Sequence, residues 1–198
     1  MFVTFEGLDG SGKTTQAELL GRHLSERGHE VVMTREPGGT PLGERIRELL
    51  LGGLEMTAWA EAALFAAARA ELVEEVIAPA LDRGADVVSD RYLDSSLVYQ
   101  GVARGLGIDK VLDLNLAVTA ELLPDRTFVL IVSPHVAHER LGGAPDRIEA
   151  ESPRFQAALG SGYQQLAVLF PQRVRMLDGS LGVEELAEIV RDELGPYV

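Results

Sequence analysis

Hydrophobic residues occur along the chain in short runs that alternate with longer segments of helical periodicity. The runs are rich in Val, Phe, Ile or Leu, as expected of strands that are buried on both faces of a sheet. They cover residues 2–6, 30–34, 85–89, 127–132 and 173–178. Helical patterns lie at about 14–27, 41–52, 57–83, 109–122, 152–170 and 183–194. This alternation predicts one α/β domain, with a five-stranded parallel sheet flanked by helices.

The helical segment 57–83 is apolar over most of its circumference. A helix of this kind is usually covered on two sides, one of them by the sheet. The second cover is either another helix layer of the same chain or a second subunit. The pattern favours neither interpretation, so both stay open.

Length, composition and charge limit the class of protein. The 198 residues suit one domain, and the chain has no cysteine for a disulfide or a thiolate metal site. No apolar run is long enough for a membrane span and the N-terminus lacks a signal-peptide pattern, so we expect a cytoplasmic protein without a membrane partner. The net charge of −13 argues against a nucleic-acid partner. An anionic ligand would need a local cluster of arginines and backbone amides.

The segment after the first predicted strand reads GLDGSGKT and matches the pattern G-x-x-x-x-G-K-[ST] in full. Glycines let backbone N–H groups converge on phosphate oxygens, and the helix that begins near Lys13 adds the positive end of its dipole. We therefore expect Lys13, one of only two lysines, to contact the β- and γ-phosphates of ATP, and the Thr14 hydroxyl to ligate Mg²⁺. The expected ATP-binding residues are Gly7, Leu8, Asp9, Gly10, Ser11, Gly12, Lys13, Thr14 and Thr15.

Residues beyond this loop distinguish the proteins that use it. The guanine-reading N-K-x-D of GTPases does not occur, and the strand that would end in Asp-Glu in large ATPases ends in Asp90-Arg91. Asp90 is placed to hold Mg²⁺ through water, and Arg91 can bind a phosphate with two N–H groups. Asp9 would repel a phosphate, so it faces either a hydroxyl of a second substrate or solvent.

Five segments resemble, in their order and spacing, those of thymidylate kinases, which phosphorylate dTMP to dTDP with ATP. They read FEGLDGSGKTTQ, TREPGGTPLGERIR, LFAAARAELV, SDRYLDSSLVYQG and DRIEAE. The similarity spans nearly the whole chain. It implies a fold of the P-loop nucleoside monophosphate kinase type, with one kinase domain over residues 1–198 and a short lid at about 141–151. It also implies a homodimer, with Mg²⁺ as cofactor and ATP as co-substrate.

The resemblance implies a thymine site on the helical segment 57–83 and after the third strand. Phe65 would stack on the ring and Arg69 would bond its O4 edge, and their i, i+4 spacing puts both on one helix face. Ser96 and Gln100 would line the far side of the base pocket. Core packing is the alternative role of Phe65, whereas a buried Arg69 would need a partner for its charge.

The resemblance also implies how the sugar and phosphate of dTMP are held. Tyr99 would crowd the 2′ position and favour deoxyribose, and Asp9 would accept a hydrogen bond from the 3′-hydroxyl. Arg91 would bind the phosphate. Glu36 and Pro37 would shape their loop against the acceptor and the metal.

Catalysis is expected to depend on alignment and neutralisation of charge, because the attacking phosphate oxygen of dTMP is already anionic. Lys13 and Arg91 would supply two of the positive charges. Many members of the family place a further arginine in the glycine loop or in the lid. The loop position after Asp9 is Gly10, so we expect Arg140 or Arg147 of the lid to supply that charge.

Two alternative functions stay open. A kinase of another nucleoside monophosphate would use the same glycine loop with a different acceptor pocket. A nucleotide-dependent switch or binding module would need no second phosphate site, so the SDRY segment and the arginines of the lid argue against it.

Overall fold

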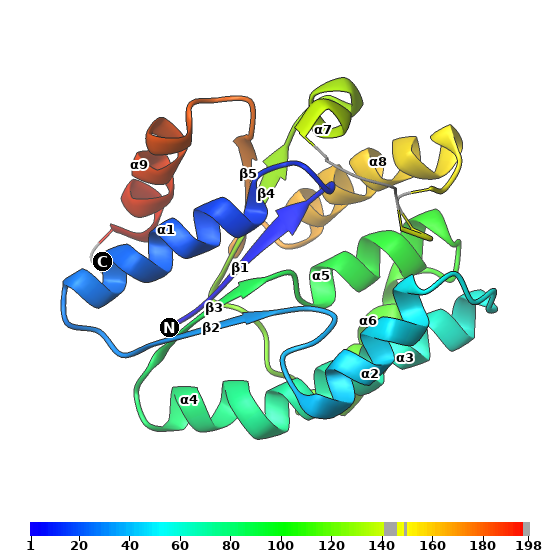
Figure 1. Ribbon diagram of the computed structural model, residues 1–198, viewed down its shortest axis with the longest axis horizontal. Helices are drawn as coiled ribbons and strands as arrows, with labels where there is room; N and C mark the ends of the chain where they lie inside the picture. Colours follow the sequence, from blue (N-terminus) through cyan, green and yellow to red (C-terminus); the bar gives the residue numbers. More distant parts are fainter. Residues whose placement is uncertain (141–145, 149, 196–198) are drawn as a thin grey trace.

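Five parallel strands form one sheet in the computed structural model, which describes residues 1–140, 146–148 and 150–195 (Figure 1). Their order is β2-β3-β1-β4-β5, with all neighbours parallel. The strands are β1 (Phe2–Gly7), β2 (Val31–Arg35), β3 (Asp86–Asp90), β4 (Arg126–Ile131) and β5 (Val174–Asp178). Each lies within one residue of its predicted range at either end, so the predicted α/β class and parallel sheet are confirmed.

Helices cover both faces of the sheet (Figure 1). Helices α1 (Lys13–Glu26) and α9 (Val183–Leu194) lie side by side on one face. The other helical segments are α2 (Pro41–Leu51), α3 (Ala58–Leu72), η1 (Val73–Ile77), α4 (Ala78–Asp82), α5 (Leu93–Ser96), η2 (Leu97–Ala103), α6 (Ile108–Val118), α7 (Pro134–Arg140) and α8 (Pro153–Leu169). Across the described ranges, none of these helices has the length and apolar character needed to cross a membrane.

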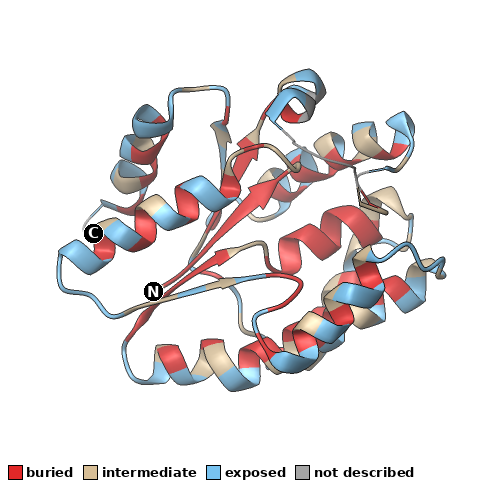
Figure 2. Ribbon diagram, in the orientation of Figure 1, coloured by how far each residue is buried: buried red, intermediate tan, exposed pale blue. Residues whose placement is uncertain are grey.

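Strand β1 places alternate side chains on the two faces of the sheet. Val3 and Phe5 pack with Leu20 of α1, and burying such a side chain contributes about 1.5–3 kcal/mol. Phe2 points to the other face, where its ring lies edge-on to that of Tyr92 at 4.9 Å between centroids. The central strands are buried along their length (Figure 2), so the loops that leave their carboxyl ends start from fixed positions.

The predicted helix 57–83 is found as three consecutive segments, α3, η1 and α4. Thr57 caps α3 by accepting a hydrogen bond from the Ala60 N–H, at 3.3 Å. The π-helical turn η1 precedes Pro79, whose missing N–H and bulky ring interrupt regular α-helical bonding. Helix α3 contacts α2, α6 and η2, so it belongs to a second helix layer of the same chain. The subunit contact stays a prediction.

Two helical segments of the structure have no counterpart among the predicted helices. The first, α5 and η2 together, is buried at every position from 92 to 101 (Figure 2). Its polar residues, such as Asp94 and Gln100, are buried as well, so they do not mark a solvent-exposed face with a helical period. The second, α7, is short and follows β4 at the carboxyl edge of the sheet.

Candidate active site

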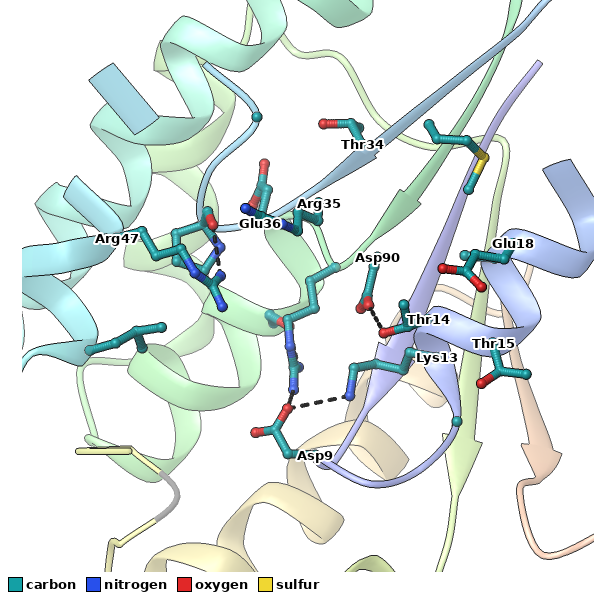
Figure 3. Close-up of a pocket in the computed structure, with 18 of the residues that line it drawn as sticks. Asp9, Lys13, Thr14, Thr15, Glu18, Thr34, Arg35, Glu36, Arg47 and Asp90 are labelled. Carbon is teal, nitrogen blue, oxygen red and sulfur yellow. Dashed lines mark hydrogen bonds and ion pairs between the residues drawn. The ribbon is translucent and has the colours of Figure 1, made fainter. Parts of the chain in front are cut away.

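A pocket of ≈ 1130 Å³ opens at the carboxyl ends of β1 and β3 (Figure 3). This volume exceeds the roughly 300–1,000 Å³ of a typical small-molecule site, so it can admit two substrates. Most of the predicted site residues line it: Asp9, Gly10, Gly12, Lys13, Thr14, Thr15, Glu36, Pro37, Phe65, Asp90, Arg91, Ser96, Tyr99, Gln100 and Arg140. The predicted residues that do not line it are Gly7, Leu8, Ser11, Arg69 and Arg147.

The glycine loop turns sharply between β1 and α1. Gly10 has a φ of 79°, and a Cβ at this position would lie 2.3 Å from the backbone oxygen of Ala137 in α7. Gly12 has a φ of 97° and precedes the first residue of α1, so the unpaired N–H groups of that helix start at the pocket. Close packing of α7 explains why a larger side chain such as arginine does not fit after Asp9 here.

Lys13 extends from the first turn of α1 into the pocket. Its side chain is 5% exposed, and Nζ donates to the Leu8 backbone oxygen at 2.8 Å and lies 3.5 Å from the Asp9 carboxylate (Figure 3). Burial and the nearby Arg91 charge lower the pKa of Lys13 to about 8. The Lys13 ammonium is therefore partly desolvated, which strengthens its attraction to a phosphate.

Arg91 and Asp9 form an ion pair between the end of β3 and the glycine loop. The Arg91 Nη2 donates to the Asp9 Oδ1 at 2.6 Å, and Nη1 donates to Ser95 Oγ at 3.0 Å. Burial alone would raise the pKa of Asp9, but Arg91 and Lys13 lower it to about 2, so Asp9 is ionised at neutral pH.

The backbone of Arg91 is strained. Its φ of 73° is in the left-handed region, which costs of order 1–3 kcal/mol for a residue other than glycine. The Arg91 N–H donates to the Phe5 oxygen at 2.9 Å, and the Ser89 hydroxyl donates to the Arg91 oxygen at 2.6 Å. These two bonds fix the turn that directs the guanidinium to the pocket, 5.4 Å from the centroid of the Tyr99 ring.

Glu6 is a functional candidate that the sequence interpretation missed. Its carboxylate is fully buried beneath Arg91, 4.0 Å from Nη1. It accepts hydrogen bonds from the Tyr92 N–H at 2.8 Å, the Ser95 hydroxyl at 2.5 Å and the Tyr163 hydroxyl at 3.1 Å. Burial raises the pKa of Glu6 to about 7. A charged residue inside an apolar strand was the available signal, because such a group requires partners.

Thr14 and Asp90 bring two oxygen ligands together at the floor of the pocket. The Thr14 hydroxyl donates to the Asp90 Oδ2 at 2.5 Å (Figure 3). Oxygen ligands suit Mg²⁺, which keeps several waters and takes the rest of its ligands from substrate phosphates. In the described part of the chain, no three His, Cys, Asp or Glu side chains cluster as a metal site.

Phe65, Ser96, Tyr99 and Gln100 line the same pocket as the glycine loop. Phe65 comes from α3, whereas the other three come from α5 and η2. Helices α3 and η2 contact each other, so the sequence segments predicted to hold the base lie together as expected.

Arg69 lies behind this wall and is fully buried. Its Nε and Nη2 donate to the Glu36 carboxylate, with Nε 2.9 Å from Oε2. Its Nη2 also donates to the Tyr92 backbone oxygen at 3.2 Å. Its Nη1 donates to Ser96 Oγ at 3.1 Å and to Asn115 Oδ1. All five N–H groups therefore have protein partners, and a bond from Arg69 to a base stays a prediction that requires one of them to be exchanged.

The two candidate lid arginines occupy different places. Arg140, at the end of α7, lines the pocket and donates to the Gly179 backbone oxygen at 2.9 Å. Arg147 donates to the Glu61 carboxylate at 2.7 Å and to the Leu50 backbone oxygen at 2.8 Å, away from the pocket lining. Much of the predicted lid, residues 141–145 and 149, lies outside the described residues.

Comparisons with known proteins agree on one family. The family model described as thymidylate kinase matches residues 5–190. A thymidylate kinase of Bifidobacterium longum is 45% identical over 199 residues, which cover 98% of this chain and 97% of that protein. One from Pelotomaculum thermopropionicum is 50% identical over 184 residues, with 90% and 85% covered.

Comparison of the fold with solved structures supports the same family. A crystal structure of thymidylate kinase from Ehrlichia chaffeensis superposes with a TM-score of 0.78 at 33% sequence identity. The match covers 96% of this chain and 98% of that one. With the glycine loop, the Asp9–Arg91 pair and a second pocket wall in one cleft, the chain belongs to the thymidylate kinase family and is a phosphotransferase.

Proposed function

We propose that this chain transfers the γ-phosphoryl group of ATP to the phosphate of dTMP and releases dTDP and ADP. The observation that carries the proposal is the Asp9–Arg91 ion pair, because it joins the ATP loop to the end of β3 in the pocket that Phe65, Ser96 and Gln100 also line. Two anionic substrates that face each other at this pair would bring their reacting phosphates together. The alternative, a kinase of another nucleoside monophosphate, has no specific observation in its favour.

Arg91 is the proposed ligand of the dTMP phosphate. Its five N–H groups exceed its described hydrogen-bond partners, which are Asp9, Ser95 and Tyr99, so a phosphate can still be bound. Its guanidinium also lines the pocket, unlike that of Arg69. The ionised Asp9 carboxylate is a hydrogen-bond acceptor for the 3′-hydroxyl of the sugar, while Tyr99 occupies the space beside it.

The ATP phosphates would bind to the backbone N–H groups of the glycine loop and to Lys13. Thr14 and Asp90 fit a Mg²⁺ ion, which when bound neutralises phosphate charge and orients the transferred group. The Thr14–Asp90 hydrogen bond holds both oxygens at the pocket before any ligand arrives.

The reaction needs no general base, because the attacking oxygen of dTMP is already anionic. Its barrier would be lowered by alignment of the two phosphates and by nearby positive charges. Lys13, Arg91 and Arg140 line the pocket and supply those charges. We assign the lid-side charge to Arg140 because Arg147 is engaged by Glu61 and Leu50.

We also infer a homodimer. Trp59, in the first turn of α3, is 46% exposed, and exposed aromatic residues are enriched at interfaces. Light scattering should give twice the mass of one chain at micromolar concentration. A mass of a single chain would contradict this inference.

The experiment that tests the function is a coupled assay of ADP formation with dTMP, dUMP, CMP, AMP and GMP as acceptors. The proposal predicts that dTMP has the highest kcat/KM and that ADP formation without an acceptor is negligible. A higher kcat/KM for another acceptor would overturn the assigned pocket. ADP formation that is independent of any acceptor would overturn the transfer reaction itself.

A further inference from the structure

The carboxylate of Glu61, on α3, holds together the far side of the acceptor pocket. Glu61 is only 1% exposed, and the two carboxylate oxygens together accept four hydrogen bonds. Oε1 accepts from Gln100 Nε2 at 2.9 Å and from Arg104 Nε at 3.1 Å. Oε2 accepts from Arg104 Nη2 at 3.0 Å and from Arg147 Nη2 at 2.7 Å. This arrangement leaves the carboxylate little freedom to rotate.

The contact with Glu61 decides which end of the Gln100 amide faces the pocket. An ionised carboxylate can only accept hydrogen bonds, so Gln100 must direct its NH₂ group at Glu61. Its Oε1 then lies at the other end, and the described chain shows no hydrogen bond to it. Gln100 lines the pocket beside Ser96, so this oxygen is an acceptor that the wall presents to a ligand.

Glu61 stays ionised because of its partners. Burial would raise the pKa of Glu61, but the bonds from Arg104, Gln100 and Arg147 bring that pKa below its ordinary value. A neutral Glu61 could donate a proton and allow the Gln100 amide to turn. Arg104 and Arg147 therefore keep Glu61 ionised, and the orientation of Gln100 depends on that ionised carboxylate.

We propose that Glu61 is a positioning residue that fixes the Gln100 amide with its oxygen toward the base and so selects pyrimidines with an N3–H over cytosine. Thymine and uracil carry a donor at N3, whereas the N3 of cytosine is an acceptor. With cytosine bound, two acceptors, the amide oxygen of Gln100 and the N3 of the base, would face each other, and neither would have a donor. The inference rests on the proposed acceptor pocket and deepens it, because Glu61 itself does not line the cavity.

The substitution Glu61→Gln tests this directly. It keeps the shape of the side chain, and Arg104 and Arg147 would hold its remaining oxygen. Its new NH₂ group then faces Gln100, which would turn and present a donor to the base. We expect the ratio of kcat/KM for dTMP to that for 5-methyl-dCMP to fall about tenfold or more. The loss should lie mainly in the KM of dTMP, since the described partners of Glu61 are Gln100 and two arginines, Arg104 and Arg147, that do not line the pocket.

The ratio is measured on one preparation of each variant, so it does not depend on how much of the protein is folded. The matched control is Glu151→Gln, since Glu151 accepts from Arg104 but does not contact Gln100 in the described structure. It should leave the ratio within about twofold of the wild type. The ratio of dTMP to dUMP should stay unchanged in Glu61→Gln, because these two bases differ in the 5-methyl group and share the N3–H.

The outcomes distinguish a failure of the role proposed for Glu61 from a failure of the proposed acceptor pocket. An unchanged dTMP to 5-methyl-dCMP ratio in Glu61→Gln, with wild-type enzyme that prefers dTMP, would overturn the role of Glu61 and leave the acceptor pocket intact. An equal loss on dTMP, 5-methyl-dCMP and dUMP would show a purely structural role and would also overturn it. A wild-type enzyme that accepts 5-methyl-dCMP as well as dTMP would instead contradict the proposed pocket.

Discussion

The guanidinium of Arg91 donates to the carboxylate of Asp9 at 2.6 Å, which joins the end of β3 to the glycine loop. These residues are 82 positions apart in the sequence, and the adjacent parallel register of β1 and β3 brings them together. The strained backbone of Arg91 directs its side chain to the pocket. The pair is therefore a fixed point between the two proposed substrate sites.

Replacing Arg91 by lysine should separate recognition of the acceptor from recognition of ATP. Lysine keeps the charge but cannot bond Asp9, Ser95 and a phosphate with one rigid fork. We expect kcat/KM for dTMP to fall about 100-fold, while the KM for ATP changes less than about threefold. Steady-state kinetics with each substrate varied in turn would measure both, and an equal loss for ATP would contradict the assignment.

The pH dependence of kcat/KM for ATP should follow the titration of the Lys13 ammonium group. The pKa of Lys13 is lowered to about 8, and its charged form is the one proposed to bind the phosphates, so kcat/KM for ATP should decline as the pH rises through about 8. The decline in kcat should occur at higher pH, because bound phosphates favour the ammonium. Substitution of Lys13 by arginine should remove this decline, since arginine does not titrate in that range. A pH profile of Lys13→Arg identical to that of the wild type would assign the titration to another group.

Arg140 and Arg147 should differ in what they contribute. Arg140 lines the pocket, so Arg140→Ala should lower kcat about 100-fold with a smaller effect on the KM of dTMP. Arg147 is bound to Glu61 and to the Leu50 oxygen, so Arg147→Ala should lower kcat less than about tenfold. Single-turnover measurements would isolate the transfer step. The reverse order of the two effects would show that Arg147 moves to the reacting phosphates.

Gly10 should tolerate no side chain, because it combines a positive φ with a close backbone neighbour. The Cβ of Gly10→Ala would lie 2.3 Å from the Ala137 oxygen, so we expect a loss of about 2–4 kcal/mol in the free energy of unfolding. Gly12→Ala is the matched control: its φ of 97° is also positive, but a Cβ there has nothing within 4 Å. Thermal or urea unfolding should show a smaller loss of about 1 kcal/mol for Gly12→Ala. Equal losses of unfolding free energy in the two variants would show that the close contact of Gly10 with α7 does not exclude a side chain.

The sequence predicted those features whose signal is local. The strands were recognisable from short apolar runs, and the glycine loop from fixed spacing around Lys13. The resemblance to a family added the acceptor residues. In contrast, α5 and most of η2 are buried, polar residues included, so their polar positions did not mark an exposed helix face.

The contacts of buried charges were not predictable, because their partners are distant in sequence. Arg69 was expected to need a partner, but Glu36, 33 residues away, and Asn115, 46 residues away, become its neighbours only in the folded chain. Glu61 lies in an apolar helix, and its four hydrogen bonds come from three residues, Gln100 and Arg104 at η2 and Arg147 of the predicted lid. A charged residue in an apolar stretch indicates that a partner exists, while the fold decides which one it is.

A crystal structure with dTMP and a non-hydrolysable ATP analogue would test the central claim most directly. We expect the dTMP phosphate within hydrogen-bond distance of Arg91, the thymine against Phe65, and the terminal phosphate of the analogue beside Lys13. Thymine bound elsewhere, or a pocket wall at Phe65 and Gln100 that stays without ligand at saturating dTMP, would contradict it.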